Sequence, residues 1–198
     1  MSPRNVEKDL QQRALRKKQI IDAAFTMFTK RGIEACKMSD IAQCAGLSHG
    51  HVYNYFQSKE ELLDTLIQRS QQLYTDMLTH AGQQPGNALD QIRWLTEYYL
   101  ADYRTGKAYW VLLQAQASDL LSDAKKQDIH QRMMHNQQLL AGIIRKGQQE
   151  GCITAGDPEE LALITVTLLT GIGMWEIRGF THSSASAHEH LLKLLSAN

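Results

Sequence analysis

The sequence predicts an all-α protein of about nine helices, and three observations favour that class. Apolar residues recur at intervals of three and four along most of the 198-residue chain, as they do on one face of an α-helix. Hydrophobic residues make up 43% of the chain, which suffices for a core and argues against disorder. Three prolines and 13 glycines are too few for the many turns of a β-sandwich.

The first expected helices are close together in the sequence. Apolar spacing predicts a helix over residues 13–30, and Gly32 ends it. Two short helices are expected over 38–45 and 49–55, with the sequence Gly-Leu-Ser at 46–48 between them. Two helices joined by a three-residue turn that contains glycine are typical of a helix-turn-helix unit.

The remaining helices are longer and begin with recognisable signals. Ser58 and Glu61 are spaced as a capping box, and Asp157 followed by Pro158 is typical of a helix start. The expected ranges are 58–80, 87–104, a helix after Gly106 that holds Tyr109 and Leu113, 122–149, 161–177 and 187–195.

Charge is divided unevenly along the chain, although its formal net charge is zero. Residues 1–59 hold ten Lys and Arg against five Asp and Glu, a net charge of +5, which leaves −5 for the rest. A basic segment of this kind suits a polyanionic partner. We therefore expect a helix-turn-helix DNA-binding domain over 1–58. The aromatic and apolar residues described below predict a helical ligand-binding and dimerisation domain over 59–198.

The segment over 13–64 carries a set of spaced residues that together point to a known domain: Ala23, Ala24, Phe28, Gly32, Asp40, Ile41, Ala42, Ala45, Gly46, Leu47, Ser48, Gly50, Tyr53, Tyr55, Phe56, Lys59, Glu60, Leu62 and Leu63. In these residues the segment resembles the N-terminal three-helix domain of the TetR family of bacterial transcriptional regulators. The resemblance implies a sequence-specific, ligand-responsive regulator. Its expected form is a homodimeric repressor that a small molecule releases from a near-palindromic stretch of double-stranded operator DNA.

The resemblance also implies which residues touch DNA. They are Met38, Ser39, Ser48, His49, Gly50, His51, Tyr53, Asn54, Tyr55 and Lys59. Tyr hydroxyls and a Lys ammonium suit phosphate contacts, whereas His49 or Asn54 could read base edges. Arg13, Arg16, Lys17 and Lys18 either add electrostatic affinity or form an ordinary solvated helix face.

Two histidines lie on the expected recognition helix, where the family often has Lys and Thr. Because histidine gains its proton near neutral pH, His49 and His51 should attract phosphate more strongly in acid. We predict tighter operator binding at pH 6 than at pH 8. Titration of the affinity across this range checks the prediction, and a flat profile would contradict it.

The last two helices are apolar enough to form a dimer interface. A helix that is apolar on most sides belongs either to an interface or to the core of the monomer, and both readings stay open here. The residues expected at the interface are Leu161, Ile164, Leu168, Ile172, Trp175, Leu191, Leu192 and Leu195.

Aromatic residues between the helix-turn-helix segment and the last two helices suit a small-molecule pocket inside a helical bundle. Each of them could equally be ordinary core, since Trp and Tyr at helical spacing usually are. The expected pocket residues are Trp94, Tyr98, Tyr99, Tyr103, Tyr109, Trp110 and Trp175. An aromatic or cationic effector would fit such walls.

Other function classes lack support in the sequence. We find no phosphate-binding glycine loop, no G-x-S-x-G motif and no metal-ligand spacing, so we expect neither an enzyme nor a bound metal or cofactor. Three scattered cysteines and the absence of a long apolar span predict a cytoplasmic protein without a membrane partner. The alternative function is a helical adaptor that uses the helix-turn-helix unit for protein contacts.

Overall fold

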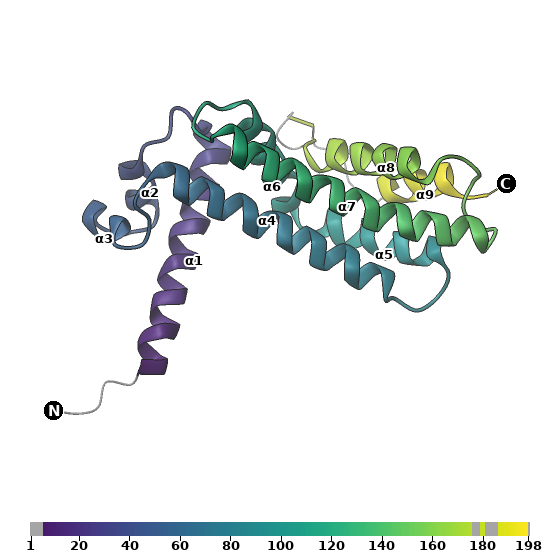
Figure 1. Cartoon of the computed structure of the whole chain (residues 1–198), viewed down its shortest axis with the longest axis horizontal. Helices are drawn as coiled ribbons and strands as arrows, with labels where there is room; N and C mark the ends of the chain where they lie inside the picture. The colour runs from purple at the N-terminus through teal and green to yellow at the C-terminus, as the bar shows by residue number, and fades with distance from the viewer. Residues whose placement is uncertain (1–5, 176–178, 181–185, 198) are drawn as a thin grey trace. The chain divides into compact units, whose positions relative to one another are not determined.

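The computed structural model describes residues 6–175, 179–180 and 186–197, and these ranges contain nine α-helices and no β-strand (Figure 1). The predicted all-α class is confirmed. The helices are α1 Val6–Arg31, α2 Met38–Cys44, α3 His49–Tyr53, α4 Lys59–Gly82, α5 Ala88–Ala101, α6 Tyr103–Ala117, α7 Asp123–Gln149, α8 Pro158–Gly173 and α9 Ala187–Leu195.

The chain forms two compact units. Unit 1 comprises Met1–Gln68 and Val111–Lys126, and unit 2 comprises Arg69–Trp110 and Gln127–Asn198. Helices α4, α6 and α7 therefore each contribute residues to both units. Packing of residues 111–126 with the N-terminal helices is a contact between distant segments, which local apolar spacing does not report. The expected domain boundary after residue 58 stays a prediction.

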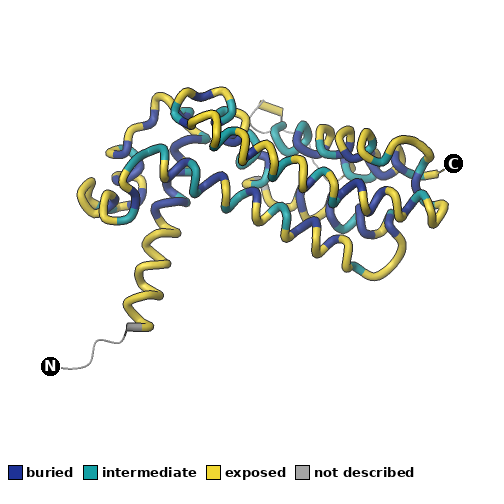
Figure 2. Tube along the Cα trace, viewed as in Figure 1, coloured by how far each residue is buried: buried dark blue, intermediate teal, exposed yellow. Residues whose placement is uncertain are grey.

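Helix α1 begins well before the start expected at residue 13. Ile20, Ala24 and Phe28 have no exposed surface, and they anchor the helix in the core of unit 1. Every side chain from residue 7 to residue 19 is exposed (Figure 2). Because apolar spacing begins only where the helix enters the core, the sequence pattern could not mark the true first turn.

Asp40 organises the connection from α1 to α2. Its Oδ2 accepts a hydrogen bond from the backbone N–H of Lys37 at 2.9 Å, and its Oδ1 pairs with Arg31 at 3.1 Å. Gly32 ends α1 with a φ of 82°, in the left-handed region that favours glycine. The acid in the first turn of α2 thus stabilises the start of α2, where the connection from α1 ends.

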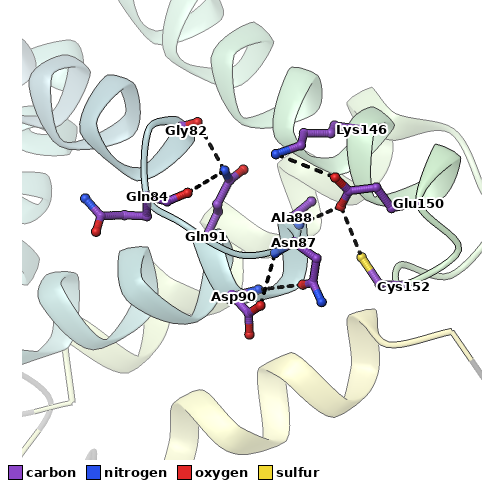
Figure 3. Close-up of polar contacts among 9 residues, drawn as sticks. All are labelled: Gly82, Gln84, Asn87, Ala88, Asp90, Gln91, Lys146, Glu150 and Cys152. Atoms are coloured by element: carbon purple, nitrogen blue, oxygen red, sulfur yellow. Dashed lines mark hydrogen bonds and ion pairs between the residues drawn. The ribbon is translucent and has the colours of Figure 1, made fainter.

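Unit 2 packs parts of α4, α5, α7, α8 and α9 around one apolar core. At the start of α5, Asn87 and Asp90 exchange side-chain to backbone hydrogen bonds of 3.0 and 3.1 Å (Figure 3). Glu150 at the end of α7 accepts from the N–H of Ala88 at 2.7 Å, and this bond is the main reason why the pKa of Glu150 is lowered. The start of α5 is therefore joined to α7.

Within the described ranges, no helix has both the length and the apolar character needed to cross a bilayer.

Candidate nucleic-acid interface

The turn between α2 and α3 has helix-turn-helix geometry. Gly46 has a φ of 65°, and the N–H of Leu47 donates to the carbonyl of Ala42 at 2.9 Å, which closes the end of α2. Ile41 and Val52, one from each helix, have no exposed surface. The two helices thus share a small core that fixes α3 on the surface of unit 1.

Helix α3 buries only Val52 and presents its other side chains to solvent. Its exposed residues, with the one that follows, are His49, Gly50, His51, Tyr53 and Asn54. The rings of His49 and Tyr53 meet edge to face, with centroids 4.8 Å apart. An added Cβ on Gly50 would meet nothing within 4 Å, so this fold does not itself require glycine there.

The predicted contacts at the starts of α2 and α3 divide into buried and exposed residues. Met38 is 7% exposed and packs in the core, which leaves its side chain little surface for DNA. Ser39 is exposed. The Oγ of Ser48 accepts from the N–H of His51 at 3.2 Å and so caps α3, while its O–H can still donate to a phosphate.

Lys59, at the start of α4, is bound to the protein's own backbone. Its Nζ donates to the carbonyls of Ile33, Glu34 and Cys36 at 2.9, 3.3 and 3.1 Å. An ammonium group has three donors, so these carbonyls occupy all of them. Lys59 therefore holds the α1–α2 connection, a role that the sequence pattern does not reveal. Its direct phosphate contact stays a prediction.

Two basic residues of α1 lie against the aromatic residues that directly follow α3. The guanidinium carbon of Arg13 is 5.3 Å from the centroid of the Tyr55 ring, and the Nζ of Lys17 is 5.3 Å from that of Phe56. Tyr55 also packs against His51, with ring centroids 5.5 Å apart. The basic part of α1 and the polar face of α3 therefore adjoin each other within unit 1.

The chemistry of this surface suits an anionic partner. Imidazole, phenol, amide and guanidinium groups offer hydrogen-bond donors, and residues 48–57 contain no acid. Phosphate oxygens and the acceptor atoms of base edges both need such donors. No group of His, Cys, Asp and Glu among the described residues is placed to hold a metal ion.

Unit 2 contains three tyrosines that we call the tyrosine cluster: Tyr74, Tyr99 and Tyr109, the last of which is near enough to help raise the pKa of the other two. The rings of Tyr74 and Tyr99 meet edge to face, with centroids 6.0 Å apart. The hydroxyl of Tyr74 is buried, and no described residue forms a hydrogen bond with it. Burial, chiefly, raises the pKa of Tyr74 and of Tyr99 above the usual value. Both phenols therefore stay neutral hydrogen-bond donors.

The predicted pocket residues do not form one group in the structure. Tyr99 and Tyr109 belong to the tyrosine cluster, whereas Trp94 stacks on Tyr98 with centroids 5.0 Å apart, and Tyr98 is 58% exposed. Trp110 and Trp175 are half-buried, and the side chain of Tyr103 lies outside the described residues. The sequence pattern did not single out Tyr74, because its spacing on α4 indicates only a core position.

The predicted interface residues behave differently on α8 and on α9. Leu191, Leu192 and Leu195 of α9 are each at most 3% exposed and pack in the core of unit 2. On α8, Ile164 and Leu168 are 51% and 37% exposed, as is Leu163 at 53%, which was not predicted. Leu161, Ile172 and Trp175 are half-buried. Apolar spacing finds an apolar face but does not tell what covers it.

Comparison with known proteins gives a family and several relatives. Residues 20–66 match the model of the family described as bacterial regulatory proteins, tetR family. The chain is 26% identical over 136 residues to the HTH-type transcriptional repressor KstR2 of Mycobacterium tuberculosis, which covers 69% of this chain and 68% of the relative.

Two solved structures share the fold. A transcriptional regulator from Saccharomonospora viridis in complex with choline is 21% identical, with a TM-score of 0.76 over 92% of this chain and 98% of that chain. AibR in complex with isovaleryl coenzyme A and operator DNA is 18% identical, with a TM-score of 0.76 over 91% of this chain and 97% of that chain. At these identities the likeness shows the fold alone.

The matched segment contains the whole helix-turn-helix unit and extends to Leu66 on α4. The family and the curated relatives are regulators of transcription rather than enzymes, as predicted from the sequence. Residues 20–66 therefore match the tetR family of bacterial regulatory proteins, and curated relatives that are similar over a larger part of the chain are HTH-type transcriptional repressors.

Proposed function

We propose that the chain is a homodimeric transcriptional repressor that binds a near-palindromic operator through α3 and leaves it when a small molecule binds unit 2. The observation that carries this proposal is the exposed, acid-free face of α3. Gly50 stands there in open space, so a nucleic-acid backbone can approach the helix closely. A second helix of this kind lies in the major groove in helix-turn-helix proteins.

The side chains of this face fall into two roles. His49 and Asn54 are exposed and can donate to base edges, which supplies sequence selectivity. Tyr53 and Tyr55 carry hydroxyls suited to phosphate oxygens, which position the protein without reading sequence. Together they support selective binding of duplex DNA.

The dimer is proposed to use α8. Leu163, Ile164 and Leu168 expose an apolar face that a second copy of the chain would cover. A twofold axis through this face would relate two α3 helices. Two such helices contact half-sites about one DNA turn apart, which requires an operator with twofold symmetry.

The effector is proposed to bind at the tyrosine cluster. A buried phenol without a partner among the described residues favours a ligand that brings a hydrogen-bond acceptor. Aromatic rings also suit a cation, and one structural neighbour holds choline. A ligand that binds better to the form with low operator affinity weakens operator binding. By the same factor, bound operator weakens binding of the ligand.

Replacing Tyr74 by phenylalanine should stabilise the ligand-free protein. The change removes a buried hydroxyl without a described partner, and such groups cost about 1–3 kcal/mol. Thermal unfolding should shift upward by roughly 2–4 °C for each kcal/mol gained. The matched variant Tyr98→Phe alters a ring that is 58% exposed and should leave the transition unchanged. A lower transition temperature for Tyr74→Phe would show that the hydroxyl has a partner.

Binding of DNA tests the proposed function. The probes are a duplex enriched by the protein from a random-sequence pool, called here the selected duplex, and a scrambled duplex of the same composition. We expect affinity for both to fall with salt, and affinity for the selected duplex to exceed that for the scrambled one at least about 1,000-fold. Binding of neither duplex, together with salt-insensitive binding of a protein, would support the adaptor alternative instead.

A further inference from the structure

The first part of α1 is a basic helical segment that has no buried residue. We call residues 7–19 the α1 arm. All of its side chains are exposed, in contrast to the buried stripe that begins at Ile20 (Figure 2). It carries five Lys and Arg against two acids, a net charge of +3.

The orientation of the α1 arm follows from helical spacing and from two contacts. Arg13 and Lys17 are one turn apart, and they continue the stripe of α1 that carries Ile20 and Ala24 in the core. On the N-terminal side of Ile20, this stripe contacts the residues that directly follow α3, through the Arg13–Tyr55 and Lys17–Phe56 pairs. Arg13 and Lys17 therefore lie on the side of the arm that faces the residues directly after α3.

These contacts do not by themselves account for the charges. A cation over an aromatic ring contributes little at an exposed site, and an apolar side chain would cover the same rings. A cationic stripe beside an acid-free helix is complementary to a polyanion that spans both. Each additional phosphate neutralised by Lys or Arg adds affinity that does not depend on sequence.

We propose that the α1 arm binds the sugar-phosphate backbone of the duplex that α3 contacts, with Arg13 and Lys17 as its phosphate ligands. This inference rests on the proposed function, because it needs α3 to bind DNA. It extends the DNA contact to residues 7–19 of α1, which precede the matched segment 20–66.

A pair of matched double variants tests this proposal. Arg13→Gln with Lys17→Gln removes the two charges that face α3, and Lys8→Gln with Lys18→Gln removes two charges from the roughly opposite side of the helix. Both pairs change the net charge equally, and glutamine keeps the helix propensity of Lys and Arg. Any difference between them is therefore due to position rather than to total charge.

Affinity is measured for the selected and the scrambled duplex over a range of salt concentrations. The Arg13 and Lys17 pair should bind both duplexes about tenfold more weakly, and the slope of log affinity against log salt should decrease by about 2, at roughly 0.9 for each lost phosphate contact. The Lys8 and Lys18 pair should lose less than about threefold. The charge-preserving pair Arg13→Lys with Lys17→Arg should restore the salt slope.

Equal losses for the two glutamine pairs would overturn the proposal, because they would indicate a general effect of charge. Unchanged affinity and salt slope for the Arg13 and Lys17 pair would also overturn the proposal. The partner of the arm would then have to be something other than this duplex, such as an acidic protein or an anionic membrane. In either case the wild-type protein still binds the selected duplex. If the wild-type protein binds no duplex, the proposed function itself fails.

Discussion

Replacing His49 and Tyr53 together by alanine is expected to weaken binding of the selected duplex about 100-fold. Loss of a base-edge contact costs about 1–3 kcal/mol, and loss of a phosphate contact lowers affinity further. The two rings pack on each other at the surface of α3. Removing both together therefore avoids leaving one ring exposed without the other to pack on. Because Val52 and Ile41 keep their burial, unit 1 should remain folded.

The matched control for this variant is His80→Ala with Tyr98→Ala. These residues are also an exposed His and an exposed Tyr, and the ring of each contacts the ring of Trp94 in unit 2. The control should bind the selected duplex like the wild type. Fluorescence anisotropy at fixed salt measures both variants. Equal affinity of the His49 and Tyr53 variant and the control would show that α3 does not contact the duplex.

Replacing Gly106 by alanine is expected to lower the free energy of unfolding of unit 2 by about 3 kcal/mol. An added Cβ on α6 would overlap the backbone carbonyl of Gly173 on α8, and a backbone group cannot rotate away. A Cβ on Gly173 would in turn lie 3.2 Å from Cε1 of Tyr99. Forcing the two helices apart should therefore also disturb the tyrosine cluster.

Gly142→Ala supplies the matched control for Gly106→Ala. Gly142 lies within α7, and an added Cβ there would meet nothing within 4 Å. Alanine at this helical position should stabilise the protein by about 0.5–1 kcal/mol. Thermal unfolding followed by circular dichroism should thus shift down by roughly 10 °C for Gly106→Ala and slightly up for Gly142→Ala. Two equal transitions would mean that α6 and α8 do not approach closely through these glycines.

The helix-turn-helix unit was predictable because its signals are local. The glycine turn at Gly46, the spacing of Ile41 and Val52, and the polar sequence of α3 all lie within a few turns of helix. The start of α1 was not predictable, because residues 7–19 have no apolar stripe against a core. Charge composition instead marked this segment as unusual.

Roles that depend on contacts between distant residues could not be predicted. Lys59 binds three carbonyls some 25 residues earlier in the chain, and the side chain of Gln114 accepts from the N–H of Ile33 at 3.3 Å. Local spacing likewise does not distinguish the core leucines of α9 from the exposed face of α8, because both helices carry apolar residues at helical spacing. Burial of the Tyr74 hydroxyl became visible only in the folded chain.

Sequencing the duplexes that the wild-type protein retains from a random-sequence pool tests the central claim most directly. The account predicts one enriched motif with twofold symmetry, whose half-sites are centred about one DNA turn apart. The His49 and Tyr53 double alanine variant, carried through the same selection, should fail to enrich this motif. A wild-type pool that stays random after selection, or a motif that the variant enriches equally, would contradict sequence-specific recognition of DNA by α3.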